Sequence, residues 1–452
     1  MEKKTNILNM TEGNPARLLL WFALPMLLGN LFQQFYNLVD CIVVGRYVGA
    51  NALAAVGATG SINFLIISIS NGIGSGIGIV AAQYFGAGQP VQVRRTIANS
   101  VYVVGMVGVV MSVLGFALAD PLLHLLDTPS EYVEDSVRYM RITCGLSLAT
   151  VAYNTVSALL RALGDSKTPL KFLVVASCVN IVLDLAFVLY FHMEVAGVAY
   201  ATVVAQLTAA VGSMIYALCR NPYFRVSRQE RHVNWDIIRR SFSIGTPIAF
   251  MSSMIALSCI ALQWVVNGFG PVVGAANTAL GKIEQLVQQP FASLCTALST
   301  FTGQNLGAGR YDRIRQGFWV GLKAVLAFAV VMFFVPQLFG SQIISIFVKE
   351  PEVIALGAKA LRITSCFYFM LGMIYITRGV LNGIGDNAFA MMNGVTELTC
   401  RVGIAKPVTM IPAVGKWGIW ITTGLTWFIT GAVNVFRYRQ KIGGKGARKK
   451  AD

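Results

Sequence analysis

The sequence predicts an all-α membrane protein with twelve transmembrane helices in two parallel six-helix repeats. Three observations lead to this prediction: an apolar composition, basic residues confined to alternate loops, and motifs that recur at a constant spacing. Of the 452 residues, 55% are hydrophobic and only 12% are charged, whereas a soluble domain carries roughly 25% charged residues. The loops must therefore take the few charges, and lipid must solvate much of the remaining surface.

Apolar runs of about 20 residues, each long enough to cross a hydrocarbon core of about 30 Å, recur along the whole chain. They place the first six helices at 15–41, 52–82, 95–119, 133–161, 169–190 and 196–218. They place the second six at 236–267, 275–303, 316–346, 356–381, 388–412 and 417–437. Between the two sets, an Arg-rich stretch at about 220–240 indicates a linker that joins an N-terminal lobe (1–220) to a C-terminal lobe (221–452).

The basic residues lie in alternate loops and at both ends of the chain. They include Arg94, Arg95, Arg161, Lys167, Arg310, Arg313, Arg437, Lys445, Arg448, Lys449 and Lys450. The opposite loops are poor in basic residues or acidic, as at Asp120, Asp127 and Glu131. Cytoplasmic loops collect Lys and Arg, so both termini are expected in the cytoplasm. This rule also accounts for the net charge of +16, so nucleic acid is not expected as a partner.

An internal repeat connects the two lobes. Residues 83–88 (QYFGAG) recur as 304–309 (QNLGAG), an offset of 221 positions. The same offset, or one residue more, joins Arg141 to Arg362, Gly164 to Gly385, Thr202 to Thr423, and Pro25 to Pro247. Each repeat holds an even number of helices, so both insert in the same orientation. Parallel repeats of this kind are related by an axis along the membrane normal, and a cavity is expected between them.

Two acidic residues are predicted to lie deep in the N-terminal lobe, Asp40 in the first helix and Asp184 in the fifth. Charges are costly inside a bilayer, so such residues are functional candidates. Further polar side chains lie on the same helix faces as these two acids or on the sixth helix: Gln33, Tyr36, Asn37, Asn180, Thr202 and Gln206. Asp40, Asp184 and Thr202 are all expected in the same half of the membrane, where they can meet.

Three interpretations of these acids remain open. Two neighbouring carboxylates in a low-dielectric site cannot both stay charged, so one of them can hold a proton and switch the local conformation. Alternatively, carboxylate, amide and hydroxyl oxygens suit a small cation such as Na⁺. In the third interpretation each acid is only a satisfied structural hydrogen-bonding group.

The C-terminal lobe departs from this pattern. Ala261, Arg401 and Ala405 stand where the first lobe has Asp40, Asn180 and Asp184. Glu397 and Arg401 lie four residues apart on the eleventh helix and are expected to form an ion pair. Glu284, near Lys282 in the eighth helix, either faces the cavity and attracts a cationic substrate or belongs to a structural pair.

Other motifs receive structural interpretations. The glycines from Gly72 to Gly78 lie in a transmembrane segment with no preceding strand and no phosphate-binding Lys, so they indicate close helix packing. The eight cysteines have no spacing typical of zinc sites or a disulfide framework. With no Walker motif and no His or Cys constellation, neither ATP-driven transport nor a membrane-embedded enzyme is favoured.

The twelve-helix repeat, the paired motifs 82–88 and 303–309, Pro25, Pro247 and the segment 161–169 (RALGDSKTP) resemble the multidrug and toxic compound extrusion (MATE) family. The resemblance covers nearly the whole chain. It implies two six-helix lobes in a V shape that export cationic, amphipathic drugs in exchange for H⁺ or Na⁺ by alternating access, without a cofactor. It also implies a monomer in the cell (inner) membrane of a bacterium or archaeon.

The resemblance also assigns roles to residues. Asp40, Asn180, Asp184 and Thr202 match the cation-coupling network of the DinF-like prokaryotic branch, including a possible Na⁺ site. The substrate cavity is expected to involve Gln33, Tyr36, Asn37, Asn154, Gln206 and Glu284. The acidic pair that NorM-like members carry in the C-lobe is not evident here. The alternative within the superfamily is a lipid-linked oligosaccharide flippase, which would need a strongly basic central cavity.

Overall fold

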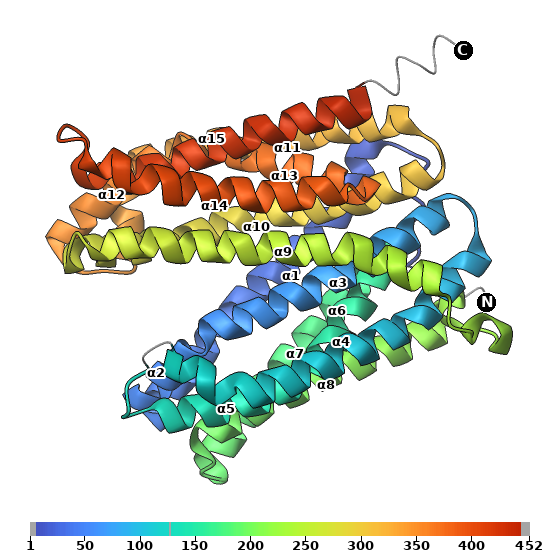
Figure 1. Cartoon of the computed structure of the whole chain (residues 1–452), viewed down its shortest axis with the longest axis horizontal. Helices are drawn as coiled ribbons and strands as arrows, with labels where there is room; N and C mark the ends of the chain where they lie inside the picture. The colour runs from blue at the N-terminus through green and yellow to red at the C-terminus, as the bar shows by residue number, and fades with distance from the viewer. Residues whose placement is uncertain (1–5, 126–127, 444–452) are drawn as a thin grey trace. The chain divides into compact units, whose positions relative to one another are not determined.

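In the computed structural model, residues 6–125 and 128–443 are described, and they are almost entirely helical (Figure 1). The α-helices are α1 Pro15–Val43, α2 Ala50–Ala58, α3 Gly60–Gly86, α4 Pro90–Leu125, α5 Val133–Gly145, α6 Ser147–Ala162, α7 Lys167–Leu185, α8 Glu194–Arg220, α9 Trp235–Asn267, α10 Pro271–Gly307, α11 Tyr311–Ser345, α12 Pro351–Ser365, α13 Tyr368–Ile384, α14 Asn387–Met410 and α15 Gly418–Tyr438. π-Helical turns continue α1, α7 and α15 at Val44–Val48, Ala186–Tyr190 and Arg439–Gly443. Several charges used to orient the chain lie outside the described residues: Asp127, Lys445, Arg448, Lys449 and Lys450.

The predicted membrane spans agree with the helices, except that the span predicted at 52–82 is divided at Thr59 into α2 and α3. Within the described ranges, eight helices are long and apolar enough to cross a membrane, and two bent helix pairs raise the number to ten. The remaining two spans are α10 and α14, which carry intramembrane charges such as Glu284 and Arg401. Together these elements make the twelve spans that the sequence predicts.

Two of the predicted helices are broken at equivalent positions. The span predicted at 133–161 bends by 45° between α5 and α6, and the span predicted at 356–381 bends by 50° between α12 and α13. The breaks lie at Leu146 and Phe367, whose backbones leave the helical region in the same way. These two residues are 221 positions apart, so the kink belongs to the repeat.

The packing of the helices repeats as the sequence does. In the first half α3 packs against α6 and α7 against α8, and in the second half α10 packs against α13 and α14 against α15. The helix ends agree as well. Gly88 and Gly309 have φ of 66° and 70°, the left-handed conformation in which glycine carries no steric penalty.

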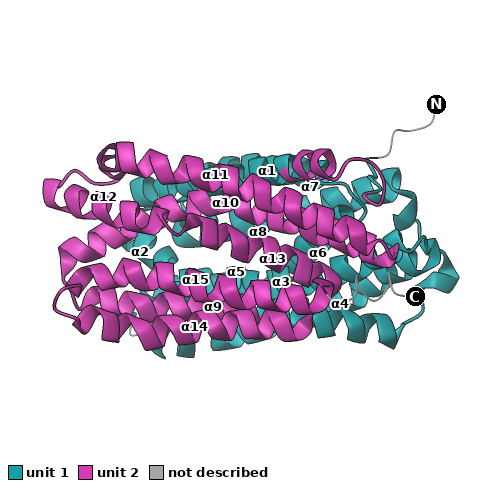
Figure 2. Ribbon diagram, turned by 90° about the horizontal axis from the view of Figure 1, so that it is seen from above, with its two compact units in different colours: residues 1–9, 24–249 teal, residues 10–23, 250–452 magenta. Residues whose placement is uncertain are grey.

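The chain forms two compact units (Figure 2). Unit 1 contains residues 1–9 and 24–249, and unit 2 contains residues 10–23 and 250–452. They differ from the expected lobes in two segments. The start of α1 belongs to unit 2, which otherwise contains the second repeat. The linker and the start of α9 belong to unit 1, which otherwise contains the first repeat.

The glycines of α3 allow its neighbours within unit 1 to approach closely. A Cβ atom on Gly72 would lie 2.5 Å from the backbone nitrogen of Ala249, and one on Gly76 would lie 2.5 Å from the carbonyl oxygen of Ser241. Both contacts are to α9. Small residues permit this close backbone packing between transmembrane helices, so the structural interpretation of the glycine run is confirmed.

Candidate functional site

Two acidic side chains meet inside unit 1. Asp40 lies near the end of α1 and Asp184 near the end of α7, and their carboxyl groups are hydrogen-bonded to each other. Asp184 is fully buried. A hydrogen bond between two carboxyl groups requires a proton on one of them, because an ionised carboxylate only accepts. The arrangement can therefore hold one proton between the two carboxyl groups.

The amide of Asn180 connects this pair to α8. In the orientation that satisfies both of its polar atoms, its Nδ2 donates to Asp184 Oδ2 at 2.9 Å, and its Oδ1 accepts from the backbone N–H of Thr202 at 3.2 Å. Asn180 lies one helical turn before Asp184 and is fully buried. The structure thus brings together all four residues of the expected coupling network.

Two tyrosines complete the cluster. The hydroxyl groups of Tyr36, on α1, and Tyr139, on α5, lie near the Thr202 side chain and interact electrostatically with both carboxyl groups. Tyr139 is 6% exposed. The sequence did not indicate Tyr139, because it reaches the site through the packing of α5 on α8 and shares no helix face with the acids.

The other expected cavity residues are dispersed. Gln33 and Asn37 are exposed on α1, so only Tyr36 and Asp40 of the predicted polar stripe face the cluster. Asn154 is held by α3, where its Nδ2 donates to Ser70 Oγ at 2.9 Å. Gln206, one turn beyond Thr202, has a buried Oε1 without a hydrogen-bond partner among the described residues.

The carboxyl pair retains unused binding capacity. Asp40 Oδ1 and Asp184 Oδ1 are both buried and have no hydrogen-bond partner in the described part of the chain. Two negative charges this close repel each other in a medium of low dielectric constant. The site can therefore exist with a shared proton, or with a small cation that the free carboxylate oxygens coordinate.

A second polar cluster lies in unit 2, and its ion pair differs from the expected one. Glu397 Oε1 accepts from Arg378 Nη2 of α13 at 3.1 Å and from Asn393 Nδ2 at 3.4 Å. The expected Glu397–Arg401 pair is wrong, since Arg401 interacts with Glu397 only at longer range. Arg378, on the neighbouring helix α13, is therefore closer to Glu397 than Arg401 is, one turn further along α14.

Arg401 faces a different acid. Its Nη1 lies 2.8 Å from Cys259 Sγ on α9, and it interacts electrostatically with Glu284 on α10. Lys282 is exposed, and it lies two residues from Glu284, on another side of the helix. The structure therefore favours Arg401 over Lys282 as the counter-charge of Glu284.

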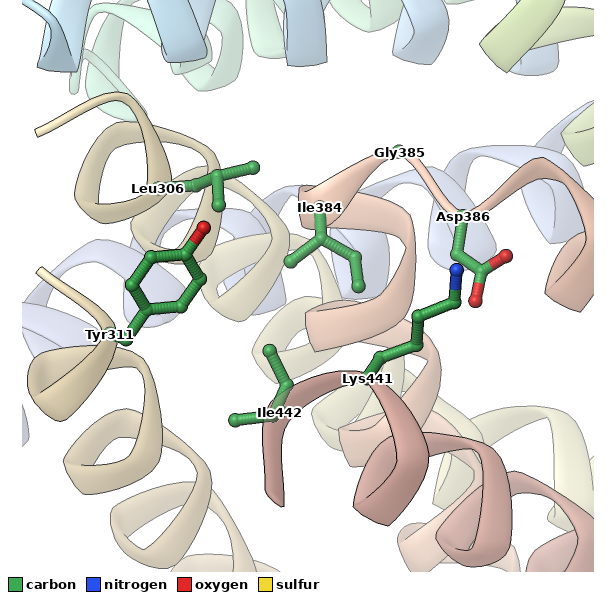
Figure 3. Close-up of a pocket in the computed structure, with 7 residues that line it drawn as sticks. All are labelled: Leu306, Tyr311, Ile384, Gly385, Asp386, Lys441 and Ile442. Carbon is green, nitrogen blue, oxygen red and sulfur yellow. The ribbon is translucent and has the colours of Figure 1, made fainter. Parts of the chain in front are cut away.

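A small pocket lies at one end of unit 2, away from these clusters. It has a volume of about 180 Å³ and is lined by Leu306, Tyr311, Ile384, Gly385, Asp386, Lys441 and Ile442 (Figure 3). Asp386 is already occupied, because Arg437 donates to both of its oxygens at 2.8 and 3.0 Å. It also caps the start of α14. These bonds indicate a structural joint between α13, α14 and α15.

Comparison with known sequences agrees with this architecture. The MatE family model matches residues 25–186 and 247–405, more than half of the chain. The probable multidrug resistance protein YoeA of Bacillus subtilis (strain 168) is 29% identical over 397 residues, which cover 86% of this chain and 85% of YoeA. The probable multidrug resistance protein YpnP of the same strain is 28% identical over 95% of this chain and 96% of YpnP.

The fold is also found in solved structures. A MOP superfamily transporter from Pyrococcus furiosus Vc1 (DSM3638) superposes with a TM-score of 0.91. The alignment covers 98% of this chain and 99% of that one, at 22% identity. At this level of identity the likeness establishes the fold.

Proposed function

Because the chain belongs to the MatE family of multi-pass membrane transporters, we propose that it is a secondary antiporter that exports cationic amphipathic drugs or toxic compounds. The entry of H⁺ or Na⁺ drives this export by alternating access, in which the substrate site between the two lobes opens to one side of the membrane and then to the other. Two relatives that align with most of the chain are named as probable multidrug resistance proteins. The observation that carries the proposal is the buried carboxyl pair of Asp40 and Asp184.

The coupling follows from the chemistry of that pair. With one proton shared, the carboxyl groups hold α1 against α7. Without the proton, two adjacent carboxylates repel each other unless a cation takes its place, so occupation of the site changes the position of α1. Gln33 and Asn37, which are exposed on the same helix, would move with it in the substrate path, and Tyr36, Asn154 and Gln206 would line the adjoining wall.

The distribution of acids supports a DinF-like member of the family. The second repeat has Ala261 or Leu262 at the position of Asp40, depending on which of the two offsets applies, and Ala405 at that of Asp184, so ion coupling is assigned to the first repeat alone. We further place both termini in the cytoplasm and the transporter, as a monomer, in the inner membrane.

Reconstituted vesicles test this function. A pH gradient alone or a Na⁺ gradient alone is imposed, and wild-type protein is expected to export rhodamine 123, a fluorescent cation, under one of the two. The gradient that drives export identifies the coupling ion. Asp40→Asn and Asp184→Asn are expected to reduce this export to the level of empty vesicles, because neither variant can form the ionised pair. Asp120→Asn, at an exposed position of α4, is the matched control. Full ion-driven export by both cluster variants would exclude the carboxyl pair as the coupling site.

A further inference from the structure

The linker between the repeats carries an excess of positive charge. Six arginines and two acids lie in residues 220–240. Glu230 is buried and bound to Arg94 at 2.7 Å, so Asp236 is left as the exposed acid of this segment. Three of the arginines are exposed and take part in none of the ion pairs that join described residues: Arg228, Arg231 and Arg239.

Hydrogen bonds to α4 fix the backbone of the linker. Asn99 Oδ1 accepts from the backbone N–H of Asn234 at 2.8 Å, and Asn99 Nδ2 donates to the carbonyl of His232 at 3.3 Å. The hydroxyl group of Tyr102 donates to the carbonyl of Arg231 at 2.9 Å. The tendency of Lys and Arg to collect in loops on one side of the membrane requires no such order, so these bonds indicate a surface with a defined shape.

The fixed backbone groups the exposed side chains. A capping box closes the 3₁₀-helix Arg228–Arg231, and because three residues make one turn of such a helix, its first and last arginines lie on the same side. Trp235, which is 73% exposed, and Arg239 are one turn apart at the start of α9. We call these four residues the arginine surface.

The exposure pattern of α4 places the arginine surface at the membrane boundary. A band of exposed apolar side chains runs along α4 from Val101 to Leu118. At 1.5 Å per residue it spans about 26 Å, close to the hydrocarbon core of about 30 Å. Tyr102 lies at one edge of this band and holds the backbone of Arg231 there. The arginine surface is therefore expected at the level of the lipid head groups.

The chemistry of the arginine surface selects its partner. Guanidinium groups bind phosphate oxygens through charge-assisted hydrogen bonds, and Trp concentrates where lipid head groups meet the acyl chains. A soluble anion would neutralise the arginines and leave the indole ring of Trp235 in water. An anionic phospholipid offers a phosphate to the arginines and apolar surface to the indole ring. Basic clusters beside a transmembrane helix attract such lipids.

We propose that the arginine surface binds the head group of an anionic phospholipid such as phosphatidylglycerol. Its phosphate lies at Arg228 and Arg231, and its glycerol and upper acyl chains lie against Trp235. This site belongs to unit 1 and is separate from the carboxyl pair. It requires neither a particular cargo nor a particular coupling ion, so it does not rest on the proposed export function.

Lipid binding to the purified full-length protein in detergent tests the site. Native mass spectrometry compares phosphatidylglycerol with phosphatidylcholine of the same acyl chains, and wild type is expected to bind phosphatidylglycerol more tightly. The double variant Arg228→Gln/Arg231→Gln is expected to weaken phosphatidylglycerol about thirtyfold, because each basic residue near an anionic surface contributes about fivefold. It should leave phosphatidylcholine unchanged. Both side chains are exposed, so the variant is expected to fold.

A matched control removes the same charge elsewhere. Lys167→Gln/Lys171→Gln changes two exposed residues of α7 and should weaken neither lipid. Equal weakening of phosphatidylglycerol by the arginine and lysine variants would mean that net charge alone attracts the lipid, and it would overturn the site. Unchanged binding in the arginine variant would overturn it as well.

A second measurement follows Trp235 itself. Brominated lipids quench tryptophan fluorescence on contact, and Trp235→Phe identifies the part of the quenching that belongs to Trp235. This part is expected to saturate at a lower mole fraction of brominated phosphatidylglycerol than of brominated phosphatidylcholine, and the difference should vanish in Arg228→Gln/Arg231→Gln. No quenching at Trp235, or displacement of phosphatidylglycerol by an equal concentration of soluble glycerol 1-phosphate, would contradict a lipid as the partner.

Discussion

Gln304 on α10 accepts a hydrogen bond of 2.8 Å from the backbone N–H of Met10, 294 residues earlier in the chain. The carbonyl of Met10 accepts in turn from Asn305 Nδ2 at 3.2 Å and from Arg313 Nη2 at 3.1 Å. The recurring QxxGAG motif is therefore more than a turn signal, because its glutamine holds the segment that leads into α1. In the first repeat the equivalent Gln83 accepts from Arg240 near the start of α9.

Gln304→Ala is expected to loosen the segment before α1, because it leaves the buried N–H of Met10 without its acceptor, at a cost of about 1–3 kcal/mol. Hydrogen–deuterium exchange of the peptide that contains Met10 should become faster. Gln285→Ala, at an exposed position of the same helix, is the control. Unchanged exchange at Met10 would show that Asn305 and Arg313 suffice.

Gly76→Ala is expected to destabilise unit 1 by about 1–3 kcal/mol, the usual cost of overpacking. The added methyl group would lie 2.5 Å from the backbone oxygen of Ser241, and a backbone atom cannot turn aside as a side chain can. Thermal unfolding in detergent measures the effect. Gly105→Ala provides the comparison, since a Cβ there meets nothing within 4 Å; equal stabilities of the two variants would contradict the close packing of α3 and α9.

Arg378 and Glu397 are expected to behave as a coupled pair. Their side chains are 12% and 6% exposed, so Arg378→Gln or Glu397→Gln alone leaves a buried charge behind, which costs about 3–5 kcal/mol. The double variant should be more stable than the sum of the two single effects predicts. Unfolding free energies of the four proteins give the coupling directly, and strictly additive effects would rule it out.

Glu230, in the linker between the repeats, should make stability depend on acid pH. Burial raises the pKa of its carboxyl group, but hydrogen bonds from the backbone and hydroxyl group of Ser227 and from Arg94, at 2.7 Å, outweigh burial and lower the net pKa. The contribution of Glu230 to the free energy of unfolding is thus fully present above the pKa of about 4.3 that its carboxyl group has in the unfolded chain. It is lost as the pH falls through the lower pKa of the folded protein.

Thermal unfolding of wild type and Glu230→Gln between pH 3 and pH 7 measures this contribution. The stability difference between the two proteins is expected to be largest near neutral pH and to shrink below about pH 4.3. Glu131→Gln, which changes an exposed carboxylate, should show no such trend. A difference that grows on acidification would mean that the sign of the pKa shift is wrong.

The sequence predicts the helices well because burial in lipid requires long apolar runs whatever their neighbours are. Even α10 and α14, whose charges weaken the apolar signal, are predicted from the apolar runs at 275–303 and 388–412, and the constant offset pairs them with α3 and α7. The breaks at Leu146 and Phe367 are not predicted, since both lie within apolar runs and arise from local backbone geometry.

Contacts within the candidate sites can be predicted from the sequence only where the two partners lie on the same helix or where the internal repeat relates their positions. Asn180 and Asp184 are one turn apart, so their common face follows from the helical period. Arg378 and Tyr139 reach their clusters from other helices, and the rotation of one helix against the next decides those contacts. For the same reason the spacing of Glu397 and Arg401 predicts a pair that the structure replaces with Glu397 and Arg378.

The exchange of segments between the units has a consequence for how the chain can be divided. Each unit is completed by the first residues of the other repeat, 10–23 in one case and 221–249 in the other. A chain cut at the linker would yield two fragments, each missing a part that only the other supplies.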